Sequence, residues 1–338
     1  MHTTLAARIE RWSEAGQPVL NVQGLFWQQL LTRTDAPRTG RVGKKERLQG
    51  PRESDRWAAA FQQSGGPPPG TDWTYVADRE SDIAEVFART REHDVGFIVR
   101  ACQARAVIAE EGNLFELAAC APVKGHFEVP MRARPGQPAR TANVQVRARQ
   151  VTIRGPYRPG KKMPAETLNV VEIKELHPPS GVPPLHWVLL TTWPCETLEQ
   201  CRAVAQAYTS RWLIEEYHKA LKSGTGVEQS QLETAHALQT LLAVLSLVAV
   251  RLLGLKMAAR ADPDKAIEQD SLGDEVWAVL AKKFGKPRGG WTHRTTLTSI
   301  ARLGGFLARK GDGDPGWLTI WRGWRRLVLL AEGYALGN

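Results

Sequence analysis

Four polar side chains near position 210 have the types and spacing for chemistry on a phosphate. Tyr208, Arg211, Glu215 and Lys222 are separated by gaps of two, three and six residues, and Lys219 lies between the last two. At about 100° per residue, an α-helix would place these four within an arc of roughly 60°. Because buried charges must be paired or hydrogen-bonded, an apolar core would not accept this charged stripe.

The spacing alone leaves two interpretations of the charged stripe open. In the first, it is a solvated helix face on which Arg211 with Glu215, and Glu215 with Lys219, form weak i,i+4 ion pairs. In the second, it is a phosphodiester site, where Glu215 is one ligand of a catalytic divalent metal and the cations and the phenol bind phosphates.

A second carboxylate stands at the end of a predicted strand. The apolar run Trp73–Ala77 predicts a buried strand, and Asp78 follows it directly, where α/β sheets bind ligands. Asp78 could instead only cap the helix predicted at Ser81–Thr90. Two-metal phosphoryl transfer uses carboxylates around ions roughly 3.5–4 Å apart, and Asp78 and Glu215 would supply two of them.

The composition favours a polyanionic partner and a reducing compartment. Lys and Arg number 45 against 35 Asp and Glu, which gives a net charge of +10. This excess favours nucleic acid as the partner, although a merely soluble basic protein has the same balance. The four cysteines show neither a CxxC pair nor zinc-ligand spacing, and the first residues lack the apolar run of a signal peptide. We expect a cytoplasmic protein.

The elements that must position these residues alternate between strands and helices. His2–Ile9 and Val19–Trp27 predict a hairpin, and Val95–Arg100 and Leu185–Thr192 predict two further strands. Thr197, with Gln200 three residues later, fits a capping box that opens the helix with the charged stripe.

Three other segments complete the predicted organisation. From 101 to 184, short alternating pieces between Gly- and Pro-rich turns predict an antiparallel β insertion. The basic segment Thr32–Arg56 predicts an exposed loop that could also follow a phosphate backbone. Ala237–Leu255 approaches the length of a membrane span, but it contains Gln239 and Arg251, so we expect a buried core helix.

Five ordered sequence blocks carry a family resemblance. They are DRESDI at Asp78, WVLLTTWP at Trp187, RWLIEEYHKALKSGTGVEQSQLE at Arg211, LSLVAVRLL at Leu245 and IARLGGFLARKGDGDPGW at Ile300. With the Y-x2-R-x3-E-x6-K spacing intact, they resemble the insertion-sequence-4 family of DDE transposases, in particular its transposon-5-like branch. The resemblance covers nearly the whole chain.

This resemblance implies a mixed α/β protein with a ribonuclease H-like fold, a β insertion before the helix of the catalytic Glu, and a helical C-terminal region. The expected divisions are a first part of the catalytic core at 1–100, the insertion at 101–184, the second part of the core at 185–260, and a dimerisation region at 261–338. The resemblance also implies a two-metal site for Mg²⁺ or Mn²⁺. The implied partners are double-stranded DNA, as transposon ends and target, and a second copy bound through the C-terminal region. No membrane is implied, and the location would be the bacterial cytoplasm, associated with the nucleoid.

The resemblance assigns roles position by position. Asp78 matches the second acid of the DDE triad and Glu215 the third, and both would bind the metal. Trp187 would stack a flipped base while a hairpin forms at the transposon end. The remaining predicted DNA contacts are Tyr208, Arg211, Lys219, Lys222, Arg100 and Trp212.

One departure from the family concerns the first catalytic Asp. The family places it on a core strand upstream of a hairpin like His2–Trp27, after a domain that binds the element's ends. Asp35, Asp55 and Asp72 precede the DRESDI block, but all three lie in predicted loops or helices. We therefore expect an N-terminally truncated copy that lacks the first strand, the first Asp and the end-binding domain and does not cleave DNA alone.

Three functions stay open from the sequence. The first is a DDE transposase of the cut-and-paste type, which works by metal-dependent strand cleavage, end hairpin formation and strand transfer. The second is a dimerising inhibitor of a full-length transposase, and unchanged transposition on co-expression would argue against it. The third is an unrelated basic nuclease, which leaves the C-terminal sequence blocks unexplained.

Overall fold

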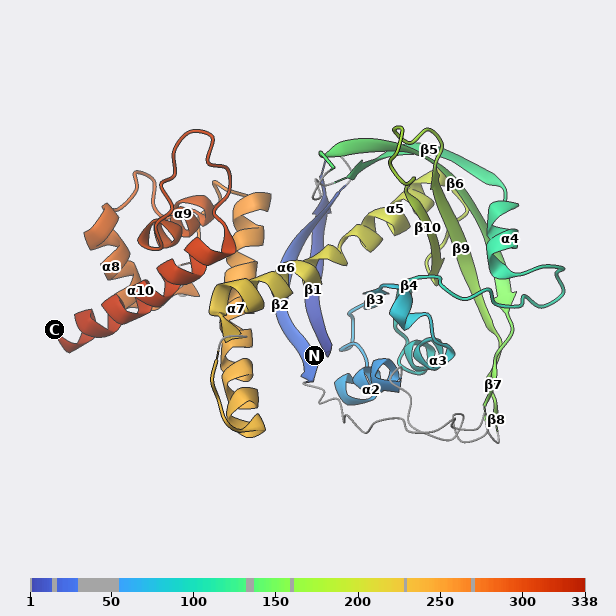
Figure 1. The fold of residues 1–338 in the computed structure, drawn as a ribbon, viewed down its shortest axis with the longest axis horizontal. Coiled ribbons are helices and arrows are strands. Elements are labelled where there is room, and N and C mark those ends of the chain that lie inside the picture. The colour runs from blue at the N-terminus through green and yellow to red at the C-terminus, as the bar shows by residue number, and fades with distance from the viewer. Residues whose placement is uncertain are drawn as a thin grey trace. The chain divides into compact units, whose positions relative to one another are not determined.

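The computed structural model describes residues 2–13, 17–29, 55–131, 137–158, 161–227, 230–268 and 271–337. The chain forms two compact units, drawn in Figure 1. We call residues 32–211 the sheet unit and residues 1–31 with 212–338 the helical unit. Most of the predicted basic loop Thr32–Arg56, with Asp35, lies outside the described residues.

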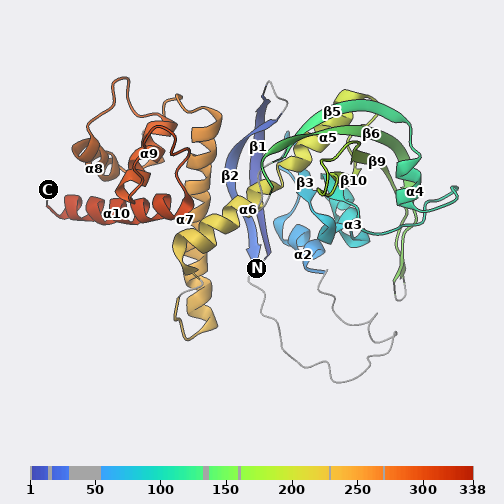
Figure 2. The ribbon, with the colours of Figure 1, turned by 45° about the horizontal axis from the view of Figure 1, so that its top comes forward.

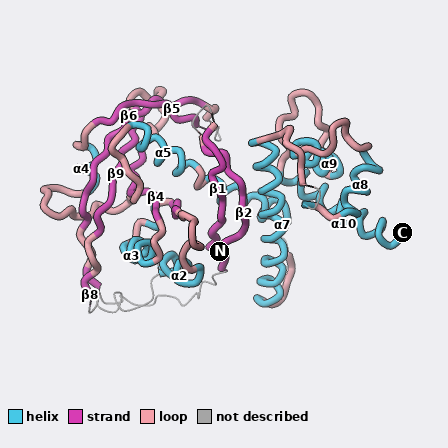
Figure 3. The backbone as a smooth tube through the Cα atoms, turned by 180° about the vertical axis from the view of Figure 1, so that it is seen from behind, coloured by secondary structure: helices cyan, strands magenta, loops and turns pink. Residues whose placement is uncertain are grey.

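The sheet unit is built on a six-stranded mixed sheet (Figure 3). Its strands, in order across the sheet, are β3 (Thr74–Ala77), β4 (Gly96–Arg100), β10 (His186–Thr191), β9 (Glu166–Glu175), β6 (Arg140–Ile153) and β5 (Val123–Met131). β3 and β4 are parallel, and each of the other neighbouring pairs is antiparallel. The strands of the predicted insertion therefore extend the same sheet as β4 and β10.

Alternating side chains cover both faces of this sheet. On β4, Ile98 packs in a cluster with α5 (Leu198–Thr209), whereas Phe97 and Val99 pack in a second cluster with α3 (Ala84–Glu92). Both faces are apolar because helices bury both, as is usual for the parallel part of an α/β sheet. The fold class is mixed α/β, as predicted.

Short elements complete the sheet unit. They are α2 (Asp55–Ser64), η1 (Arg79–Ser81), α4 (Leu114–Ala119) and the small hairpin of β7 (Tyr157–Arg158) and β8 (Lys161–Lys162). The predicted capping box is confirmed, because the Thr197 hydroxyl accepts from Gln200 N and the Gln200 side chain accepts from Thr197 N. The helix predicted at Ser81–Thr90 begins later, at Ala84, because η1 occupies the first turn.

The helical unit combines the predicted hairpin with helices from the second half of the chain (Figure 2). β1 (His2–Trp12) pairs antiparallel with β2 (Pro18–Gln29), which confirms the hairpin. The helical segments are α6 (Trp212–Lys219), the π-helical η2 (Ala220–Gly224), α7 (Ala235–Ala261), α8 (Asp274–Phe284), α9 (His293–Leu303) and α10 (Trp317–Leu336). Apolar residues of both strands pack on α7 in one core.

Only the second half of α7 fits the expectation of a buried core helix. Its buried residues begin at Ser246, whereas Val244 is 56% exposed. The helix starts at Ala235, because the Thr234 side chain accepts from Ala237 N as an N-cap. By length and composition alone α7 could also cross a membrane, and it is the one helix among the described residues that could.

Two glycines allow α9 and α10 to cross closely. A Cβ on Gly304 would lie 1.9 Å from the Thr319 carbonyl oxygen, and a Cβ on Gly323 would lie 1.8 Å from the Ile300 carbonyl oxygen. Only glycine fits at such a backbone approach. The predicted turn at 311–316 lies between these helices, as expected.

Candidate functional site

The parallel pair β3–β4 brings two predicted site residues to one edge of the sheet. Ala77 pairs with Val99, so Asp78 and Arg100, the next residues of the two strands, stand side by side at the carboxyl ends. Asp78 Oδ1 accepts from Glu80 N at 2.9 Å and caps η1. Asp78 therefore caps the short turn η1 through one carboxylate oxygen, whereas the sequence alternative had it cap the longer helix that follows, whose N-cap is Ile83.

Strand β10 and helix α5 add aromatic side chains to this edge. Arg100 pairs with Leu189 of β10, and its Nη2 donates to the His186 carbonyl oxygen at 3.0 Å. The next residue, Trp187, meets the ring of Tyr208 edge-on, with ring centroids 5.2 Å apart. Arg100, Trp187 and Tyr208 thus lie at the same end of the sheet unit.

The pKa of Tyr208 is influenced by the charges of other residues at this edge. Burial raises the pKa of the Tyr208 phenol, Arg211 and Arg100 oppose that rise, and the charge of Asp78 adds to it. Arg211 also hydrogen-bonds to the phenol. The sheet unit therefore gathers five of the predicted site residues: Asp78, Arg100, Trp187, Tyr208 and Arg211.

The four other predicted residues belong to the helical unit. Trp212 and Glu215 lie on α6 with Lys219 at its end, and Lys222 is exposed on η2. Lys219 Nζ is 4.8 Å from the centroid of the Trp212 ring, so the two side chains form a cation–π contact.

The prediction of one continuous helix for the charged stripe is wrong. α5 ends at Thr209 and α6 begins at Trp212, with a turn at Ser210 and Arg211 between them. Ser210 N and Arg211 N bond to carbonyls three residues back, and the Ser210 hydroxyl bonds to the Ala207 carbonyl. These local bonds compete with the four-residue pattern of an α-helix and end α5. Beyond Lys219 the chain changes to a π-helix, and such segments are frequent at functional sites.

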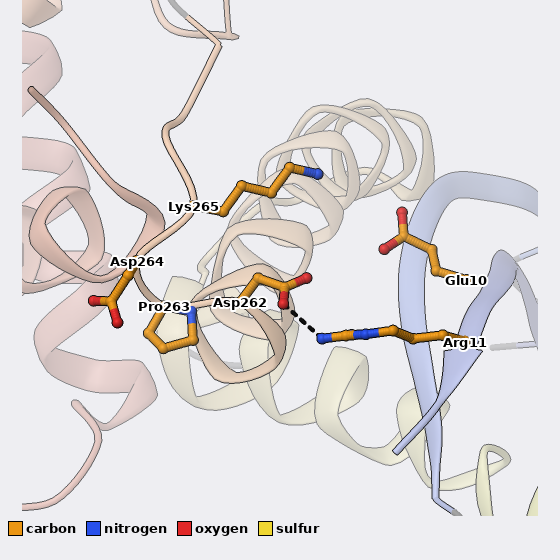
Figure 4. Close-up of a pocket in the computed structure, with 6 residues that line it drawn as sticks. All are labelled: Glu10, Arg11, Asp262, Pro263, Asp264 and Lys265. Carbon is orange, nitrogen blue, oxygen red and sulfur yellow. Dashed lines mark hydrogen bonds and ion pairs between the residues drawn. The ribbon is translucent and has the colours of Figure 1, made fainter. Parts of the chain in front are cut away.

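One hollow of the helical unit is lined by other residues. It has a volume of about 470 Å³ and is lined by Glu10, Arg11, Asp262, Pro263, Asp264 and Lys265. Figure 4 shows that Arg11 reaches across it to Asp262, and the two form an ion pair of 2.6 Å. None of the predicted site residues lines it, so this hollow does not mark the site.

Two family profiles match the sequence. The transposase DDE domain matches residues 27–251, and the Tn5 transposase dimerisation domain matches residues 247–337. The chain belongs to the DDE transposases. It is of the insertion-sequence-4 and Tn5 type. This family implies a DNA substrate and a divalent metal, and the dimerisation domain implies self-association of the transposase.

The DDE match contains every predicted site residue of the transposase, from Asp78 to Lys222. Carboxylate oxygens such as those of Asp78 and Glu215 are the ligands that hard divalent cations prefer. Across the described residues, no group of three or more His, Cys, Asp and Glu side chains is arranged to hold a metal ion. The fit of Asp78 and Glu215 to the metal therefore rests on the chemistry of their carboxylates and not on a preformed cluster among the described residues.

The sequence did not predict the surroundings of two residues of α6 in the transposase, His218 and Glu216. Burial lowers the pKa of His218, and the charge of Lys222 lowers it further, which favours the neutral imidazole. Glu216 accepts a hydrogen bond from Trp317, 101 residues away. Neither role could be inferred from spacing, because neighbouring Glu, Tyr and His residues on a helix give no sign of which one is buried.

Proposed function

We propose that this transposase carries out cut-and-paste transposition, with Asp78 and Glu215 as two ligands of a catalytic Mg²⁺ ion. The observation that carries the proposal is the register of β3 and β4, which sets Asp78 beside Arg100 at the edge where Tyr208 and Arg211 also lie. A carboxylate beside cations suits a site that holds both a metal and a phosphate. We further propose that the sheet is a ribonuclease H-like core.

Each side chain at the site has a role in this proposal. The bound metal would activate the attacking oxygen and offset charge on the scissile phosphate. Arg100 and Arg211 would bind phosphate oxygens through charge-assisted hydrogen bonds. Because burial raises its pKa, the Tyr208 phenol keeps its proton and can donate to a phosphate oxygen.

The aromatic residues and lysines of the proposal extend the DNA contact away from the metal. Trp187 is only partly buried, and its ring, fixed edge-on against Tyr208, would stack an extruded base. Lys219 and Lys222 are exposed and would contact the DNA backbone, with Trp212 beneath Lys219. A second copy would bind through the dimerisation domain.

The variants D78N and E215Q test the catalytic part of the proposal. Asn caps a helix as well as Asp does, so D78N keeps the bond to Glu80 N and removes the charge that a metal needs. The matched control is D72N, because Asp72 is an exposed acid outside the predicted site.

The assay is Mg²⁺-dependent nicking of DNA that carries the element's ends. Any nicking by the native chain should be lost in D78N and E215Q and kept in D72N, and nicking that survives both site substitutions would refute the roles of the two acids.

A further inference from the structure

Glu216, next to the proposed metal ligand Glu215, lies within a network of hydrogen bonds inside the helical unit. Its Oε2 accepts from Trp317 Nε1 at 3.1 Å, and its Oε1 accepts from Trp212 Nε1 at 3.4 Å. Lys219 Nζ is 3.7 Å from the same Oε1. The Glu216 side chain is only 12% exposed, so these contacts replace water around its carboxylate.

The far side of this network belongs to the dimerisation domain. Trp317 is the first residue of α10, and Lys256 of α7 places its Nζ 4.3 Å from the centroid of the Trp317 ring. Both residues lie within the match to the dimerisation domain, 247–337. Glu216 therefore connects the helix that carries Glu215 directly to that domain.

Apolar burial already attaches α6 to the unit without Glu216. Leu213 and Tyr217 are buried in the core, and the Tyr217 hydroxyl accepts from Gln28 Nε2 at 3.1 Å. Apolar contact is non-directional, whereas a hydrogen bond to a carboxylate has a defined geometry. The bond from Trp317 to Glu216 is thus suited to fix the rotation and axial position of α6.

We propose that Glu216 is a positioning residue through which the dimerisation domain sets the orientation of α6 and, with it, the carboxylate of Glu215. This inference rests on the proposed role of Glu215 as a metal ligand. It makes the start of α10 part of the support of the catalytic site, although Trp317 touches neither metal nor DNA in the proposal.

The substitution W317F isolates the hydrogen bond, because it removes the indole N–H and retains an aromatic ring. The same helix offers a matched control, W321F. Trp321 is similarly buried one turn later, and across the described residues its Nε1 has no hydrogen-bond partner. E216Q is the conservative variant, since its neutral amide oxygen can still accept from Trp317.

Two measurements on the full chain test the positioning role of Glu216. The first is amide hydrogen exchange of α6, which should accelerate roughly tenfold in W317F, less in E216Q and not in W321F. The second is backbone cleavage by Fe²⁺ with ascorbate and peroxide, where the bound metal cuts the nearby chain. Cleavage next to residue 215 should fall severalfold in W317F and stay unchanged in W321F, with the helix content and the dimer fraction equal in both.

The outcomes separate this inference from the proposed function. If W317F and W321F behave alike in hydrogen exchange, Glu216 does not fix α6. If exchange rises but metal-directed cleavage at 215 is unchanged, Glu216 holds α6 without positioning the ligand, and the inference is again wrong. If the cleavage persists in E215Q, the proposed metal site itself fails, and the exchange data still decide whether the dimerisation domain orients α6.

Discussion

Replacing Asp82 by Asn is expected to destabilise the sheet unit by roughly 3–5 kcal/mol, the cost of breaking a buried ion pair by removing one partner. The Asp82 side chain is 0% exposed and that of its partner Arg105 is 8% exposed. Oδ1 accepts from Arg105 Nε at 2.9 Å and Nη2 at 2.6 Å, and Oδ2 accepts from the backbone N–H groups of Cys102 and Gln103. The carboxylate thus joins the DRESDI turn to the loop after β4.

The expected loss follows from the chemistry of the substituted amide. Asn has a single acceptor oxygen, so in D82N the NH₂ group must face either the guanidinium or the two backbone donors. Either way, donors around the buried Asp82 side chain lose their acceptor. Because about 1 kcal/mol shifts the melting temperature of a domain of this size by roughly 2–4 °C, D82N should melt about 10 °C lower.

Urea denaturation followed by circular dichroism measures the change in the free energy of unfolding. The double variant D82N/R105M should recover part of the loss, because an apolar residue replaces the stranded charge. The control is E92Q, which breaks the exposed ion pair with Arg89 and should cost less than about 1 kcal/mol. A free energy of unfolding for D82N within about 1 kcal/mol of the native value would refute this reasoning.

Three further predictions concern packing, titration and DNA contact. G323A should destabilise the helical unit by roughly 1–3 kcal/mol or more in urea denaturation, because its Cβ meets the Ile300 carbonyl. By contrast, G333A on the same helix, where nothing lies within 4 Å of a Cβ, should be neutral or stabilising; equal effects would contradict the close crossing. Burial lowers the pKa of Lys256 to about 8, so between pH 8 and 10.5 the unfolded chain binds more protons than the folded one. The free energy of unfolding of the native chain should therefore rise with pH in this window, by on the order of 3 kcal/mol relative to that of K256M. A difference between the two proteins that does not change with pH would argue against the lowered pKa. R100A should weaken DNA binding equally across sequences in a gel-shift titration and reduce the salt slope by about one; an unchanged slope would exclude a phosphate contact.

The sequence predicts the elements whose formation depends on residues close together in the chain. The hairpin follows from alternation on either side of a Gly/Pro turn, and the capping box of Thr197 and Gln200 follows from a three-residue spacing. The strand before Asp78 follows from its apolar run, and the neighbouring Arg100 follows from a second such run that pairs with it.

What the sequence could not predict depends on contacts between distant segments. The break between α5 and α6 arises at Ser210, where hydroxyl bonds to the preceding turn outweigh good helix spacing. The bond from Trp317 to Glu216 joins positions 101 residues apart, and no periodicity reports such a pairing. The half-exposed α7 was expected to be buried because its composition is uniformly apolar, but only its second half packs in the core.

Binding of Mn²⁺, measured by electron paramagnetic resonance on the native chain, D78N, E215Q and the double variant, tests the central claim most directly. If Asp78 and Glu215 share one metal site, each single substitution should weaken Mn²⁺ binding strongly, and the double substitution should add little, because residues that act together are not additive. Native affinity in both single variants, or two independent and additive losses, would contradict a shared site.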